Sequence, residues 1–281
     1  MTRAARILGA LRIRNGRVIS RYADGREVDS VALADDLIAA GATEIAIIEL
    51  AQGSADVDGT LALVRRLRRA RPSLRIAAGG GIGGLDDVGR LIQAGADRAI
   101  VGTAAIVNPE LLRQAAQRFG ADAILASMEV RLERRRGEET VDVAGDRTLL
   151  LDTTTTGGWY RVYVRGGTTA TARDAISWAA QIADMGVGEL MVTSIDPAGD
   201  ATHYDLELIG RISESVAARV LAAGPTPPAD TLVRLFTLAG GSGIVVLDAA
   251  LRTPDELRRL RSEMEAAGVV IEGPHPPLRN G

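Results

Sequence analysis

The sequence predicts a (β/α)8 barrel, a TIM barrel, from three observations: eight short apolar runs, amphipathic stretches between most of them, and a length that fits eight repeated units. The chain has 281 residues, of which 46% are hydrophobic and 25% charged, as in ordinary globular domains. A doubly wound parallel sheet is the structural alternative. We expect one domain over residues 1–272, followed by a flexible Pro-rich tail at 273–281.

Each predicted strand is a short run of aliphatic residues, and the eight runs cover residues 5–13, 44–50, 74–79, 98–102, 123–130, 189–196, 219–224 and 243–249. The helical segments between them include residues 31–42 and 174–188, which carry Gly near their ends as a helix C-terminus should. The stretches 77–105 and 221–251 share one order of strand, glycine turn, helix and strand. This repetition indicates a barrel built from two half-barrel repeats.

The composition excludes several classes of function. The net charge of −3 favours neither nucleic acid nor an anionic membrane as a partner. The sequence has no cysteine, which excludes thiolate nucleophiles and thiolate metal ligands, and all 33 basic residues are arginine, which excludes Schiff-base lysines. No signal peptide opens the chain, and no apolar run approaches the roughly 20 residues of a membrane helix. We expect a cytoplasmic protein without metal or other cofactor.

Two glycine-rich turns follow the third and fourth predicted strands. Gly80 and Gly81 lie at the end of strand 3, and Gly102 and Thr103 lie at the end of strand 4, on the face where barrel enzymes carry their active sites. Glycine lets backbone N–H groups approach an anion closely, so the pair predicts a phosphate site. The alternative is a pair of tight turns that bind nothing.

Five segments resemble, in order, the cyclase subunit of imidazole glycerol phosphate synthase, a half-barrel-duplicated TIM barrel of histidine biosynthesis. They are NGRVIS (15–20), AGADRAIVGTAAIVNPELL (94–112), WYRVYVRGG (159–167), DAISWAAQIADMGVGELMVTSID (174–196) and HYD (203–205). The resemblance implies a subunit that receives ammonia from a glutaminase partner, conducts it through the barrel, and uses it to cleave a bis-phosphorylated substrate at the other end.

The resemblance also implies which residues line the ammonia path. The charged gate of the family is retained at the start of four strands, as Arg6, Glu44, Arg98 and Glu189. Asp97 matches a position that faces the glutaminase, so Asp97 and Arg98 mark the expected partner face. A salt-bridge ring that only stabilises the barrel is the alternative.

The catalytic end departs from the family. Arg12 occupies the position of the first catalytic aspartate, and a guanidinium that stays protonated cannot act as a general base. Glu129 keeps the second carboxylate on a longer side chain, and Glu49 replaces an aspartate after strand 2. Ser20 and Arg21 replace a lysine and a glycine. We expect Arg12, Glu129 and Glu49 to form the altered catalytic floor, and a buried ion-pair cluster of these three residues is its structural alternative.

The second phosphate site of the family is damaged. Gly199 and Gly224 remain as its remnants, but Pro225 removes an N–H donor and Asp248 places a negative charge opposite Thr103. We therefore expect a substrate with a single phosphate, bound at the ends of strands 3 and 4.

Residues 131–158 form an insertion whose alternating pattern predicts a hairpin over the barrel mouth. Its arginines 134–136 are explained by either an anionic ligand or a solvated charge run, and His203 and His275 fit loop positions.

Two classes of function remain: a diverged synthase subunit that delivers ammonia to a singly phosphorylated compound, and a non-catalytic paralogue that keeps the barrel and its partner face.

Overall fold

The computed structural model describes residues 4–19, 29–50, 57–134, 158–196, 201, 204–247, 249 and 254–273. Eight parallel strands within these segments close into a barrel, in the order β5-β4-β3-β1-β11-β10-β9-β6, and β6 pairs with β5 to complete the ring. These strands are β1 (Arg6–Arg14), β3 (Glu44–Glu49), β4 (Ile76–Gly79), β5 (Arg98–Val101), β6 (Ile124–Arg134), β9 (Glu189–Ser194), β10 (Arg219–Gly224) and β11 (Gly243–Val246). The predicted TIM barrel is confirmed, and each strand overlaps its predicted run.

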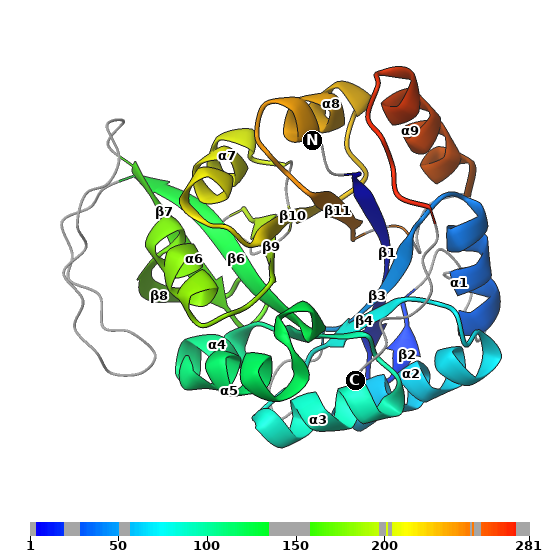
Figure 1. Cartoon of the computed structure of the whole chain (residues 1–281), viewed down its shortest axis with the longest axis horizontal. Helices are drawn as coiled ribbons and strands as arrows, with labels where there is room; N and C mark the ends of the chain where they lie inside the picture. Colours follow the sequence, from blue (N-terminus) through cyan, green and yellow to red (C-terminus); the bar gives the residue numbers. More distant parts are fainter. Residues whose placement is uncertain are drawn as a thin grey trace.

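Helices surround the ring of strands (Figure 1). They are α1 (Ser30–Ala39), α2 (Asp58–Ala70), α3 (Leu85–Ala94), α4 (Thr103–Val107), α5 (Glu110–Phe119), α6 (Ala175–Asp184), α7 (Leu206–Ser215), α8 (Ala229–Thr237) and α9 (Pro254–Ala266), with a 3-10 turn at Ala121–Ala123. Aspartates cap three of these helices: Asp29 accepts from Val31 N, and Asp174 and Asp205 act similarly for α6 and α7. No helix in the described segments is long and apolar enough to cross a membrane.

Side-chain alternation divides the core into two layers. Alternate residues of the barrel strands fill the barrel interior, among them Leu8 and Ala10 on β1 and Leu125 on β6. The residues between them, such as Ile7 and Leu11, pack outward against the helices in a larger cluster. This period of two fixes which side chains at the strand ends face the barrel axis.

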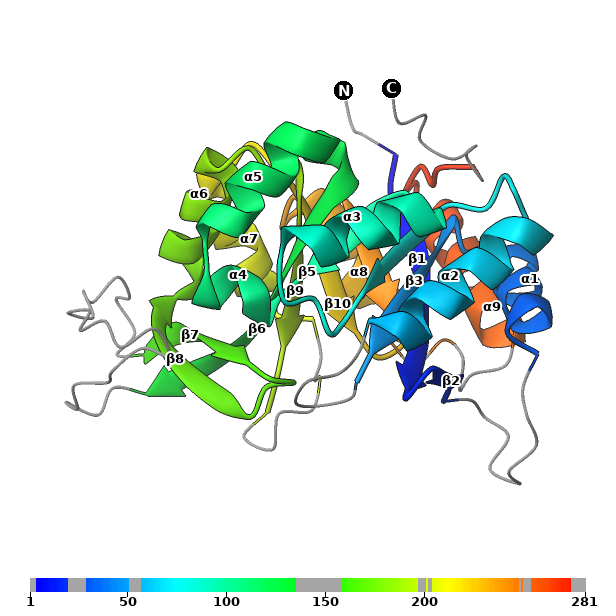
Figure 2. The same cartoon turned by 90° about the horizontal axis from the view of Figure 1, so that it is seen from below.

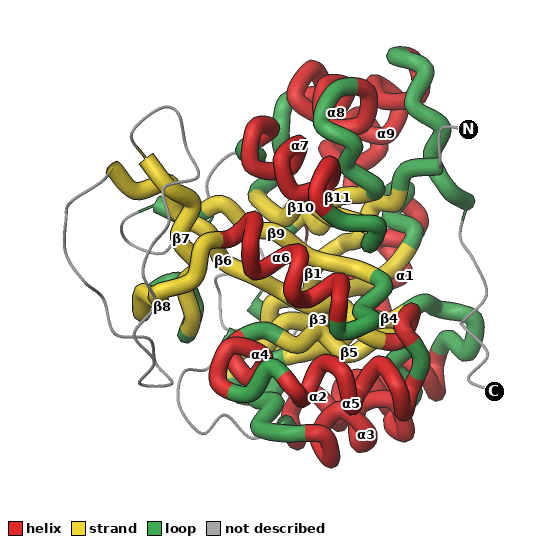
Figure 3. The backbone as a smooth tube through the Cα atoms, turned by 60° about the vertical axis from the view of Figure 1, so that its left-hand side comes forward, coloured by secondary structure: helices red, strands yellow, loops and turns green. Residues whose placement is uncertain are grey.

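An antiparallel extension leaves the barrel wall at β6 (Figure 3). Strand β6 continues past the barrel to Arg134 and pairs with β7 (Gly158–Val164), which pairs in turn with β8 (Thr169–Asp174). Short β2 (Arg17–Val18) and this extension lie at the same end of the barrel (Figure 2). Thus residues 131–134 of the expected insertion belong to β6, and residues 135–157, where its hairpin was predicted, lie outside the described residues.

Candidate functional site at the two ends of the barrel

The amino-terminal end of the barrel is closed by a ring of buried ion pairs. Arg6, Glu44, Arg98 and Glu189 each begin a strand and are at most 2% exposed. Arg98 contacts Glu44 at 2.6 Å and Glu189 at 2.8 Å, while Arg6 contacts Glu44 at 3.1 Å and also pairs with Glu189. The four charged side chains expected from the sequence therefore form a continuous ring of ion pairs.

Two further arginines join this ring, and neither was predicted from the sequence. Arg75, directly before β4, lies 3.6 Å from Glu44, and Arg219, at the start of β10, lies 3.3 Å from Glu189. Arg219 also pairs with the exposed Asp122 at 2.9 Å. The sequence pattern could have identified them, because both arginines directly precede aliphatic residues of a strand, as Arg6 and Arg98 do.

The buried arginines affect one another's protonation. Burial lowers the pKa of Arg6 to about 10, with Glu44 opposing the shift and Arg98 adding to it by repulsion. Burial alone would raise the pKa of Glu44, but the attraction of three surrounding arginines outweighs it and leaves the pKa below its usual value. At neutral pH Arg6 and Glu44 are therefore both charged.

Asp97 lies next to this ring but is held within the chain. The residue is 3% exposed, and its carboxylate accepts the N–H of Ile76 at 2.8 Å and pairs with Arg68 at 2.7 Å. Arg68 in turn donates to the carbonyl oxygen of Gly95 at 2.9 Å. The side chain thus joins α2 to the base of β4 and β5, whereas the sequence predicted a partner-facing role for it.

Glu129 is the carboxylate at the opposite end, the barrel mouth. It shares the alternation of Leu125 on β6, which fills the barrel interior, so its side chain lies on the inner side of the wall. Its Oε2 accepts the N–H of Gly167, in the β7–β8 turn, at 2.8 Å. Burial raises the pKa of Glu129, and the Gly167 hydrogen bond only partly opposes this. A carboxyl with a raised pKa keeps its proton to a higher pH than usual, which suits the role of a proton donor.

Arg12 alternates with Leu8 and Ala10 along β1, so its side chain faces the barrel interior at the mouth. The side chain of Glu49 faces the other way. Glu49 alternates with the outward-packing Ile45 and Ile47 of β3, and its carboxylate accepts from the backbone N–H groups of Asn15 and Gly16 at 3.2 and 3.3 Å. No ion pair joins Arg12 to Glu129 or Glu49 among the described residues. The ion-pair cluster considered from the sequence does not form, because strand alternation places Glu49 on the other side of the wall.

Close packing explains part of the glycine-rich turn. A Cβ on Gly79 would lie 2.3 Å from the carbonyl oxygen of Ile100, and one on Gly80 would lie 2.5 Å from the Cβ of Glu49. Gly80 and Gly81 also have φ values of +103° and +72°. Close packing therefore accounts for glycine at Gly79 and Gly80, and the positive φ values favour glycine at Gly80 and Gly81.

The β7–β8 turn also contacts the end of β5. The backbone N–H of Arg165 donates to the hydroxyl of Thr103 at 3.1 Å, and Gly102 precedes α4 as its cap. Arg165 itself adopts a left-handed φ of +56°, which is uncommon for a residue with a side chain. The position of this turn at the mouth was not predicted from the sequence, although WYRVYVRGG ends in its two glycines.

A cluster on the extension supports the turn. Glu133 pairs with Arg131 at 2.6 Å and with Arg161 at 3.1 Å, and the Tyr163 hydroxyl donates to the same carboxylate. The guanidinium of Arg131 lies over the Tyr163 ring, 4.2 Å from its centroid. These contacts join β6 to β7 just before the turn that carries Arg165.

The second phosphate site is described only in part. The Gly224 carbonyl oxygen accepts from Leu247 N at 2.8 Å and from the Tyr204 hydroxyl at 3.5 Å. Gly199 and Asp248 lie outside the described residues, as do Ser20, Arg21, His203 and His275. The described segments contain no group of three or more His, Asp or Glu side chains that could hold a metal ion.

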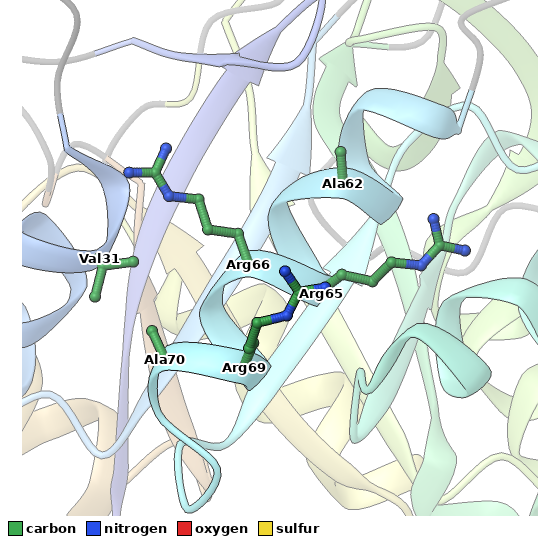
Figure 4. A pocket seen from close by; sticks show the side chains of 6 residues that line it. All are labelled: Val31, Ala62, Arg65, Arg66, Arg69 and Ala70. Carbon is green, nitrogen blue, oxygen red and sulfur yellow. The ribbon is translucent and has the colours of Figure 1, made fainter.

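A shallow groove of about 510 Å³ lies on the outer surface, away from both barrel ends. Arg65, Arg66 and Arg69 of α2 line it with Val31, Ala62 and Ala70. Figure 4 shows Arg66 extending toward α1 and Arg65 extending the other way. Arg66 pairs with Asp29 at 3.1 Å, and both side chains are more than half exposed, so this groove is a solvated surface feature.

Comparison with known proteins agrees with this geometry. Residues 6–253 match the family described as "Histidine biosynthesis protein". The chain is 34% identical to imidazole glycerol phosphate synthase subunit HisF of Leuconostoc mesenteroides over 84% of this chain and 85% of the relative. The corresponding figures for HisF of Myxococcus xanthus are 34%, 86% and 87%, and for HisF of Frankia casuarinae 30%, 96% and 100%. The chain therefore belongs to the histidine biosynthesis protein family and is a relative of the cyclase subunits of imidazole glycerol phosphate synthase.

Proposed function

We propose that this protein is a synthase subunit that receives ammonia at the ion-pair ring and uses it at the barrel mouth on a phosphorylated, ribotide-like substrate. Glu129 is the observation that carries the proposal. It is a partly buried carboxyl with a raised pKa on the inner side of the wall, and its Oε2 accepts a hydrogen bond from the Gly167 N–H. We assign it the role of proton donor, in an enzyme that would be a lyase or cyclase subunit of a glutamine amidotransferase.

The substrate differs from that of the family. Arg12 cannot accept a proton, so only one member of the acid–base pair remains. Pro225 and Asp248 oppose a second phosphate, whereas the turn with Gly81, Gly102 and Thr103 is complete. We therefore propose one phosphate, bound at the ends of β4 and β5.

The partner is a glutaminase that docks on the amino-terminal face, over the strand starts at which Asp97 and Arg98 are buried. Arg6, Glu44, Arg98 and Glu189 would open to admit ammonia, as the retained set of charges supports. A small rearrangement suffices in principle, because Arg75 and Arg219 offer the two glutamates alternative partners at 3.6 and 3.3 Å.

The experiment is an ammonia-dependent assay of the full chain with a panel of singly phosphorylated ribotides, followed by mass spectrometry of the products. We expect one compound to be consumed, and Glu129→Gln to lower the rate by about 10²–10⁴-fold. Co-purification with a glutaminase is a separate arm that tests the partner. Turnover that survives Glu129→Gln would contradict the assigned role.

The second candidate is a non-catalytic paralogue that keeps the barrel and the partner face. The specific observation in its favour is Arg12, which replaces a catalytic carboxylate. It predicts that the glutaminase co-purifies while no ribotide in the panel is consumed, a result that separates it from the synthase.

A further inference from the structure

Arg12 is a cation held at a fixed place in the barrel mouth. It belongs to the regular part of β1, where it pairs with Ile48 of β3, and its carbonyl oxygen accepts the N–H of Ile19 at 2.8 Å. Alternation places its side chain above Leu8 and Ala10 on the inner side, and the residue is only partly exposed. Both its backbone and its direction are therefore determined by the barrel.

The charge of Arg12 is not neutralised by the described residues. Its side chain makes no hydrogen bond or ion pair within those segments, whereas the inward arginines at the other end, Arg6 and Arg98, each contact two glutamates. Glu129 does not compensate it either, since burial and the Gly167 hydrogen bond are the causes that set the pKa of that carboxyl. A partly buried, unpaired cation is costly unless a ligand supplies the counter-charge.

Arg165 is a second cation at the barrel mouth whose side chain has no partner in the described segments. Arg165 is exposed, and its backbone is anchored by Thr103, beside the proposed phosphate site. β6, which leads into this extension, lies four strands from β1 in the barrel order β1-β11-β10-β9-β6. A ligand that meets both cations must therefore carry anionic groups at two separate places.

We propose that Arg12 binds a carboxylate of the ligand whose phosphate lies beside Gly81, Gly102 and Thr103, with Arg165 contacting that phosphate. This inference rests on the proposed function for the phosphate, and it adds the substrate class: a phosphorylated carboxylic acid. The planar guanidinium fork matches a carboxylate through two parallel hydrogen bonds. A second phosphate would fit less well, because one arginine supplies one charge, and the N–H groups of the Asn15–Gly16 turn after β1 already donate to the carboxylate of Glu49.

The test compares two ligands that share a three-carbon skeleton and a phosphate. 3-Phosphoglycerate carries a carboxylate, whereas glycerol 3-phosphate carries a hydroxymethyl group at that position. Titration calorimetry of the full chain at constant ionic strength should show 3-phosphoglycerate binding about tenfold more tightly or better, as expected for charge-assisted hydrogen bonds. Arg12→Gln should remove this preference and leave glycerol 3-phosphate binding unchanged, while Arg165→Gln should weaken both ligands.

Two further variants complete the design. Arg113→Gln changes an exposed arginine of α5 that pairs with Glu110, so it should alter neither affinity. Arg12→Lys keeps the charge without the fork and should retain only part of the preference, which gives a readout if Arg12→Gln proves unstable.

The outcomes separate this inference from the proposed function. Equal affinity of the wild-type chain for both ligands, or a preference that survives Arg12→Gln, would overturn the carboxylate site while leaving the phosphate site in place. If neither ligand binds, the phosphate site fails and the inference fails with it.

Discussion

The backbone N–H of Gly167 donates to the Oε2 of Glu129 over 2.8 Å, which ties the turn between β7 and β8 to the inner wall of the barrel. The contact joins residues 38 positions apart and fixes a carboxyl that burial already shifts toward its neutral form. This hydrogen bond links the β7–β8 extension to the proposed proton donor, so a substitution in one should alter the properties of the other.

Glu129→Gln should alter how stability depends on pH. A carboxyl with a raised pKa contributes stability that is fully present below its unfolded pKa and is lost as the pH rises through the higher folded pKa. The wild type should therefore lose stability relative to Glu129→Gln as the pH rises above 4.5, the ordinary pKa of a glutamate. The loss is about 1.4 kcal/mol for each pH unit by which the folded pKa exceeds the unfolded one. Melting temperatures of both proteins from acid to neutral pH measure the difference, and parallel curves would argue against a raised pKa of Glu129 in the folded protein.

Removing one carboxylate from the base ring should strongly destabilise the fold. Glu189 is fully buried and is shared by Arg6, Arg98 and Arg219, so Glu189→Ala leaves buried guanidinium groups without a counter-charge. We expect a loss of about 3–5 kcal/mol in the free energy of unfolding. Urea denaturation of the purified variant gives this value.

The matched control for Glu189→Ala is Glu110→Ala. Glu110 pairs with Arg113 at 3.2 Å on α5, where both side chains are about half exposed. Its loss should change stability by less than about 1 kcal/mol, since exposed ion pairs contribute little. Similar effects of the two substitutions would show that the ring is not buried in solution.

Gly80→Ala tests whether packing requires the glycine turn. The added methyl would meet both the Cβ and the backbone of Glu49, at a φ of +103° that disfavours any side chain, so we expect a loss of about 1–3 kcal/mol. Gly84→Ala is the control, because its backbone is extended and a Cβ there has no neighbour within 4 Å. Thermal unfolding compares the two, and a neutral Gly80→Ala would refute the close approach.

The barrel could be predicted from the sequence because its signals are local. Each strand is an apolar run, whereas Arg6, Glu44, Arg98 and Glu189 were expected because the resemblance implies the family's charged gate at the strand starts. The arrangement of the mouth depends on longer-range relationships. Glu49 ends a strand as expected, but its direction follows from the alternation along β3 and from its bonds to a turn of β1.

The position of the β7–β8 turn was not predictable in the same way. It depends on the antiparallel register that pairs Glu129 with Tyr163, and residues 135–157 separate the two strands in the sequence. Loop length leaves such a register open, because many pairings satisfy the same alternation. Arg75 and Arg219 were missed for a different reason: the resemblance did not point to them, although each stands directly before the aliphatic residues of a predicted run.

The bis-phosphorylated histidine-pathway compound should not be a substrate of this protein. We expect negligible ammonia-dependent cleavage by the unmodified chain, because each missing acid–base group lowers rates by about 10²–10⁴-fold. Arg12→Asp should not restore the reaction on its own, since the sequence places Pro225, which lacks an N–H donor, and the anionic Asp248 at positions expected for the family's second phosphate site. The variant would also add a carboxylate to the mouth that holds the partly buried Glu129, and so should raise the pKa of Glu129 further. A spectroscopic turnover assay compares both proteins with ammonium salt in excess. Wild-type turnover of about one per second, within the ordinary range for enzymes, would mean that Glu129 or another group performs both proton transfers.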